Sequence, residues 1–139
     1  MLQNKINFQG FIKLKKITPQ RMSGKKFVGK DPIIVCTIGL MGKKRKSNYY
    51  NTYLHHFLAS QNINWKYVEF GFFDNNLYIG EGTENDFVIS KDTKNVSSKH
   101  LAETIFQFFN VRVPKNADEI ESITFDCLKL NNHYKLIKR

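Results

Sequence analysis

Short stretches of apolar residues, some alternating with polar ones and some continuous, predict several β-strands along the chain. Residues 33–40, IIVCTIGL, form a β-branched apolar run that is too short for a helix, which predicts a central strand. Residues 5–17 alternate apolar residues with lysines and predict a half-buried strand bent near Gly10. Further strands are predicted over 67–73, 77–79, 87–89, 123–130 and 134–137, the first two being joined by the turn Asp74-Asn75-Asn76.

Two other stretches repeat their apolar residues at the spacing of a helix. The first is 48–61, where Ser47 stands in position to cap the helix, and the second is 98–109, with Ser97 or Ser98 as its cap. Consecutive strands with short links favour antiparallel pairing. The sequence therefore predicts an α+β fold, a mainly antiparallel sheet with two amphipathic helices, at about 48–61 and 98–109, packed on one of its faces.

The size of the chain predicts one domain, 1–139. Its 139 residues match a typical single domain, and a hydrophobic content of 41% with 14% aromatic residues supplies enough material for one core. Residues 18–32 contain two prolines, two glycines and several basic side chains, with little that could be buried. They predict a basic loop that is free to move.

Nothing in the sequence predicts a membrane segment or an export signal. No apolar run approaches the roughly 20 residues needed to cross a bilayer, and the first residues lack the apolar region of a signal peptide. We therefore expect a cytoplasmic protein that does not bind membranes.

Positive charge is concentrated in the first third of the chain. Residues 1–48 contain twelve Lys or Arg and one acid, Asp31, for a net charge of +11, whereas residues 49–139 contain ten bases and eleven acids, for −1. Such a one-sided block favours an anionic partner, and nucleic acid is the commonest. A lysine-rich composition of the kind that AT-rich genomes give would explain the surplus of lysine. It would not explain why the acids avoid this part of the chain.

The usual sequence signatures of catalytic and metal sites are missing. His55 and His56 are adjacent, so in a helix they would point about 100° apart and could not chelate one ion. Cys36 and Cys127 lie in separate apolar segments and are expected to be reduced core thiols. Neither GxxxxGK[ST] nor GxGxxG occurs, and the acidic residues 118–121 are typical of a solvated turn. We therefore expect no enzymatic activity, no cofactor and no metal.

A basic run just ahead of the predicted helix 48–61 is the candidate binding site. The N–H groups and the positive end of a helix dipole favour a phosphate at this place, and tyrosines offer hydroxyls to phosphates or rings to bases. The alternative is a solvated basic turn whose tyrosines pack on the core. The candidate residues are Lys43, Lys44, Arg45, Lys46, Tyr49 and Tyr50, with Arg21, Lys25, Lys26 and Lys30 of the upstream loop as further phosphate contacts.

Residues 33–80 follow the order strand, loop, short helix, KYVEFGFF, a DNN turn and LYIG. This order resembles the AbrB/MazE type of swapped-hairpin DNA-binding proteins, in which a phrase like Tyr67-Val68-Glu69-Phe70 begins the hairpin. The family usually has Gly-Asp before that phrase, where this chain has Trp65-Lys66, and residues 81–139 have no counterpart. The resemblance implies an intertwined homodimer with DNA contacts from basic residues in the first hairpin, and no catalysis.

Together these features predict a non-enzymatic nucleic-acid-binding protein of the phage or mobile-element kind, with DNA rather than RNA as the expected partner. A phage-encoded protein would act in the host cytoplasm or in the virion. The alternative is a structural or interaction protein, such as a virion component or an inhibitor of a host protein, whose basic face meets an acidic protein surface.

Overall fold

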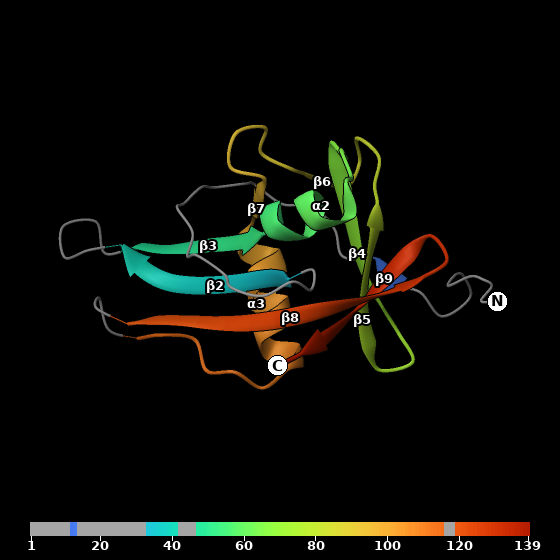
Figure 1. The fold of residues 1–139 in the computed structure, drawn as a ribbon. Coiled ribbons are helices and arrows are strands. Elements are labelled where there is room, and N and C mark those ends of the chain that lie inside the picture. The colour runs from blue at the N-terminus through green and yellow to red at the C-terminus, as the bar shows by residue number, and fades with distance from the viewer. Residues whose placement is uncertain (1–11, 14–32, 42–46, 116–118) are drawn as a thin grey trace.

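The computed structural model describes residues 12–13, 33–41, 47–115 and 119–139, and these form one antiparallel sheet and two helices (Figure 1). The sheet runs in the order β1-β4-β5-β9-β8-β2-β3-β7, and β6 pairs with β4 beside β1. The predicted α+β class with a mainly antiparallel sheet is confirmed. The strands are β1 (Ile12–Lys13), β2 (Ile33–Met41), β3 (Ser47–Tyr53), β4 (Tyr67–Phe73), β5 (Asn76–Glu81), β6 (Phe87–Val88), β7 (Asn95–Ser97), β8 (Ile120–Leu130) and β9 (His133–Lys138).

The sheet curves strongly enough to be barrel-like. In Figure 1, β2, β3 and β8 run across the view, whereas β4 and β5 run steeply past them. One stretch of chain, from β6 to β7, connects the two ends of the strand order. The Ile89 N–H donates to the Lys66 carbonyl at 2.9 Å near the start of β4, and the Leu54 N–H donates to the Lys94 carbonyl at 2.9 Å after β3. We call this stretch, residues 87–97, the seam.

Local chemistry explains the elements that the sequence predicted correctly. Asp74 and Asn75 both have positive φ, 51° and 65°, which gives the two-residue turn that suits a β-hairpin and confirms the predicted link between β4 and β5. Helix α3 (Lys99–Phe108) begins at Ser98, whose side chain accepts a hydrogen bond from the Leu101 N–H at 3.1 Å. This confirms the predicted helix 98–109.

The predicted helix 48–61 is wrong in its first half. Residues Ser47–Tyr53 form strand β3, and helix α2 occupies only His55–Gln61. The strand forms because β2 and β7 flank this segment and take its backbone hydrogen bonds, and because its tyrosines and Thr52 suit a pleated surface. Ser47 therefore caps no helix. The short strand β7 carries no clear sequence signal, and most of the predicted strand 5–17 and all of loop 18–32 lie outside the described residues.

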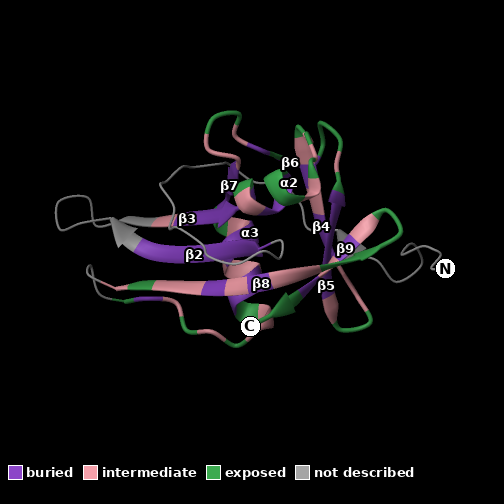
Figure 2. Ribbon diagram, viewed as in Figure 1, coloured by how far each residue is buried: buried purple, intermediate pink, exposed green. Residues whose placement is uncertain are grey.

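One hydrophobic core lies between the curved sheet and the helices (Figure 2). Both helices contribute buried side chains to it, and Cys36 of β2 donates to the Ala102 carbonyl of α3 with a sulfur–oxygen distance of 3.9 Å. Residues 33–39 of β2 are all buried, whereas the turn end of the β8–β9 hairpin is exposed. The largest fully buried side chains are Phe57, Phe70, Phe87, Phe106 and Phe125.

A buried polar row crosses four strands on the face of β2 opposite Cys36. The strand pairing places Ser97, Asn51, Thr37 and Ser122 side by side on β7, β3, β2 and β8. The Asn51 side-chain oxygen accepts from Asn95 Nδ2 at 2.6 Å and from Ser97 Oγ at 2.7 Å. Asn51 Nδ2, Thr37 Oγ1 and Ser122 Oγ are buried and have no hydrogen-bond partner among the described residues.

Replacing Thr37 by valine is expected to stabilise the protein, because the Thr37 hydroxyl has no hydrogen-bond partner among the described residues. A buried polar group without a partner costs about 1–3 kcal/mol, so Thr37→Val is expected to raise the free energy of unfolding by about 1 kcal/mol. Denaturant unfolding measures this. Ser97→Ala is the matched control, because it removes a bonded hydroxyl and should lower the same quantity by about 1 kcal/mol. A loss of stability in Thr37→Val would show that the hydroxyl has a partner.

Candidate nucleic-acid interface

The structure describes none of the sequence-predicted basic residues, and it shows a strand where a helix was expected after residues 43–46. Residues 43–46 fall in the connection between β2 and β3, and they lie outside the described residues, as do Arg21, Lys25, Lys26 and Lys30. Because Ser47 begins a strand, the helix N-terminus that was expected to assist phosphate binding at this place does not exist. This part of the prediction is wrong.

Tyr49 and Tyr50 point to opposite faces of β3. Tyr50 is only 6% exposed and belongs to the core, with Lys99 Nζ 6.0 Å from its ring centroid. Tyr49 is half-buried and lies over Gly39, where an added Cβ would come within 2.7 Å of its ring, and burial raises the pKa of its hydroxyl. Tyr50 therefore offers no ring for base stacking, as the alternative interpretation of the tyrosines expected.

Two neighbouring hollows share Trp65 and Glu81 and combine aromatic with basic side chains. The first, which we call the lysine hollow, has a volume of about 650 Å³. The second, the amide hollow, has a volume of about 540 Å³. The lysine hollow is lined by Asn64, Trp65, Lys66, Tyr67, Glu81, Gly82, Val88, Ile89, Lys91 and Lys94, and the amide hollow by Ile63, Trp65, Glu81, Lys129, Asn131, Asn132, His133 and Tyr134.

Trp65 is held in place by the aromatic side chains beneath it. Its ring centroid lies 5.8 Å from that of Phe57 on α2 and 6.2 Å from that of Tyr134 on β9. Phe57 and Tyr134 in turn pack edge to face at 4.8 Å. Asn62 ends α2 in the left-handed conformation, and the chain then runs past Trp65 into β4. Trp65 is half-buried, so part of its surface is left for a ligand.

The three lysines of the lysine hollow come from two fixed pieces of backbone. Lys66 precedes β4, and its carbonyl accepts from the Ile89 N–H at 2.9 Å. Lys91 and Lys94 belong to the turn within the seam, which is closed by the Lys94 N–H donating to the Ser90 carbonyl at 2.9 Å. No ion pair with an acid ties up any of the three within the described part of the chain.

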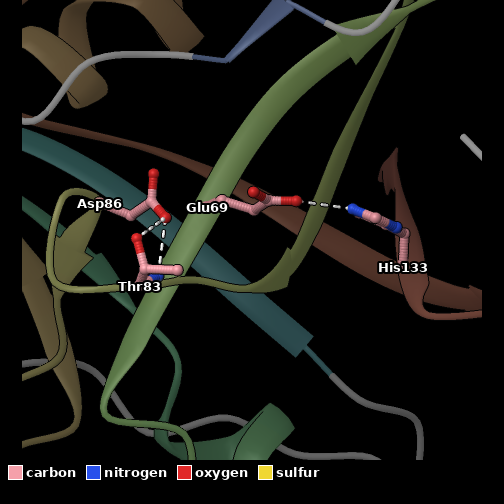
Figure 3. Close-up of polar contacts among 4 residues, drawn as sticks. All are labelled: Glu69, Thr83, Asp86 and His133. Atoms are coloured by element: carbon pink, nitrogen blue, oxygen red, sulfur yellow. Dashed lines mark hydrogen bonds and ion pairs between the residues drawn. The ribbon is translucent and has the colours of Figure 1, made fainter. Parts of the chain in front are cut away.

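The amide hollow has a different chemistry. The turn of the β8–β9 hairpin contributes the amides of Asn131 and Asn132 to this hollow. Lys129 is the one lysine among the residues that line it. His133 Nε2 lies 2.7 Å from Glu69 Oε2, so this imidazole is committed to a carboxylate of β4 (Figure 3). Counting Glu81 against Lys129, the hollow carries no surplus of positive charge.

Two local contacts lie beside residues that line the hollows. A Cβ at Gly80 would lie 2.7 Å from the His133 ring, so the His133–Glu69 contact requires glycine there. In the loop after β5, the buried Asp86 carboxylate accepts from the Thr83 N–H at 2.7 Å and from the Thr83 hydroxyl at 3.3 Å (Figure 3). These bonds close the loop beside Gly82, which lines the lysine hollow.

Reactive groups are not gathered in this region. Cys36 and Cys127 are free thiols whose pKa burial raises to about 12, with the nearby Asp126 charge adding to the shift at Cys127, so neither is an activated nucleophile. Across the described ranges, no three His, Cys, Asp or Glu side chains are grouped so as to hold a metal ion. Neither described helix has the length and apolar character that crossing a bilayer requires.

The sequence gives little sign of the hollows, because residues 49–139 carry almost no net charge. The local signal was the phrase Trp65-Lys66-Tyr67, in which a basic side chain stands between two aromatic ones. Lys91 and Lys94 could not be connected with that phrase until the path of the seam was known.

Comparisons with known proteins add no relative to this picture. No known protein family, no curated protein and no solved structure matches the chain. The resemblance of residues 33–80 to AbrB/MazE-type proteins therefore stays a prediction.

Proposed function

We propose that this protein is a cytoplasmic, non-enzymatic nucleic-acid-binding protein that holds a single strand, DNA in the first instance, across the two hollows beside Trp65. The observation that carries the proposal is the lysine hollow, where three lysines line the same space as Trp65 and Tyr67 and the volume is large enough for a nucleotide. Proteins that bind single strands combine a positive groove for the phosphates with aromatic rings for the bases.

The shape of the site favours a single strand over a duplex. Each hollow is a concavity of several hundred Å³, whereas the bases of a duplex are stacked and reach a protein only at their groove edges. An unstacked base can enter such a concavity and lie against Trp65. The charge of +11 on residues 1–48 adds a sequence-independent attraction for the same polyanion.

The fluorescence of Trp65 tests the proposal directly, because it is the single tryptophan of the chain. Oligo(dT), oligo(rU) and a duplex of equal length are titrated at low salt, while the polarisation of labelled strands reports binding anywhere on the protein. We expect the single strands to quench Trp65 with micromolar or tighter affinity, and the duplex to change this signal less.

Two results would count against the proposal in different ways. Binding detected by polarisation without any change at Trp65 would move the interface to the basic residues 43–46, and alanine substitution of those four side chains would then abolish it. The absence of binding to every nucleic acid at low salt would refute the proposal altogether.

A second candidate function, interaction with another protein, is favoured by apolar side chains exposed on the β8–β9 hairpin. Leu128 is 49% exposed and Ile137 is 43% exposed. An acidic protein partner could cover them while pairing with the lysines of the same strands. The oligonucleotide titration separates the two candidates, because a protein that binds only another protein is not expected to change its Trp65 fluorescence when oligonucleotides are added.

A further inference from the structure

We propose that the amide hollow takes a single base carrying an exocyclic amino group, and that Glu81 is the residue that selects it over thymine or uracil. This inference rests on the proposed function. It adds to that function a division of labour between the two hollows and a base preference.

The distribution of charge separates a phosphate site from a base site. The lysine hollow has three lysines against Glu81, whereas the amide hollow has one lysine against the same carboxylate. His133 adds no unpaired charge to the amide hollow because its Nε2 already faces Glu69 at 2.7 Å. A strand placed across Trp65 therefore gains most by putting its phosphates in the lysine hollow and a base in the amide hollow.

The lining of the amide hollow suits a base in shape as well as in charge. Trp65, Tyr134 and Ile63 contribute apolar and aromatic surface to its lining, and the hairpin turn contributes the amide of Asn132. Side-chain amides and carboxylates are the groups that recognise the hydrogen-bonding edges of splayed-out bases.

Glu81 decides which edge is accepted. It ends β5, is exposed, and has no ion-pair partner among the described residues. A carboxylate only accepts hydrogen bonds. Cytosine, adenine and guanine each offer an amino group to such an acceptor, whereas thymine and uracil place carbonyl oxygens on both sides of their one ring N–H. A carboxylate repels those oxygens, so it favours the amino-bearing bases.

The test compares oligo(dC), oligo(dA) and oligo(dT) of equal length by Trp65 quenching, in the full chain and in two variants. Because a carboxylate contact to a base amino group discriminates between bases, we expect oligo(dC) to bind about tenfold more tightly than oligo(dT), which corresponds to about 1.4 kcal/mol. Glu81→Gln should bring this ratio close to one, because an amide both donates and accepts. Glu84→Gln is the matched control, since it removes an equal charge from an exposed position that lines neither hollow, and it should keep the ratio.

The outcomes distinguish this inference from the proposed function. Equal binding of all three oligonucleotides, or a preference that survives Glu81→Gln, would overturn the role of Glu81 while leaving single-strand binding intact. The absence of binding to every oligonucleotide, by polarisation as well as by quenching, would refute both.

Discussion

Phe57→Ala is expected to lower the free energy of unfolding by about 3–5 kcal/mol and to weaken nucleic-acid binding at the same time. Phe57 is fully buried and packs against both Trp65 and Tyr134. Truncating it leaves a cavity in the core and removes the surface on which the Trp65 ring rests. Since typical domains are stable by only about 5–15 kcal/mol, this one change takes away a large part of the total.

Denaturant unfolding and oligonucleotide titration, with Trp65 fluorescence as the signal for both, measure the two effects. Phe57→Leu is the control, because it keeps most of the apolar volume and should cost far less stability. An Ala variant that loses less than about 1 kcal/mol would show that Phe57 is not the central contact of this cluster. A variant that is folded but binds normally would show that Trp65 does not need this support.

Neutralising the three lysines of the lysine hollow is expected to weaken single-strand binding about 100-fold at about 0.1 M salt. The change is Lys66→Gln, Lys91→Gln and Lys94→Gln together. Each phosphate contact on a single strand contributes about 0.7 to the slope of log affinity against log salt, so the slope should also become shallower by about 2. Glutamine removes the charge, keeps a polar side chain that is one atom shorter than that of lysine, and introduces no glycine or proline into the turn.

A matched triple variant separates this site from general charge. Lys99→Gln, Lys115→Gln and Lys138→Gln remove the same charge from exposed positions that line neither hollow. We expect this control to change affinity and slope much less. Equal losses in the two variants would mean that the protein attracts nucleic acid only through its net charge of +10.

The parts of the fold that the sequence predicted are those specified by neighbouring residues. The β4–β5 hairpin depends on a two-residue turn of Asp74 and Asn75, and α3 depends on a serine cap followed by an apolar stripe. Residues Ser47–Tyr53 were misassigned because Tyr50 and Tyr53 fit the spacing of a helix, whereas the outcome was decided by strands β2 and β7 on either side. Part of the pairing comes from residues distant in the sequence, so the local pattern of residues 47–53 does not reveal it.

The candidate site was harder to predict than the fold for the same reason. Trp65 and Lys66 are separated from Lys91 and Lys94 by a hairpin and a loop, and only the return of the chain through the seam brings them to one hollow. Lys129 and Asn132 come from still further along the chain, in the β8–β9 hairpin. The basic run 43–46 is easy to recognise because it is contiguous in the sequence, whereas the linings of the two hollows are assembled from separate strands and turns.

The seam also sets how binding and rigidity are related in this molecule. It joins the two ends of the strand order, so local opening of the sheet at this point would release the turn that presents Lys91 and Lys94. A ligand that needs both lysines binds the closed form and not the opened one. By mass action it then suppresses the opening in proportion to its own affinity. The sheet would thus open at the seam most often in the free protein and least often when a nucleic acid is bound.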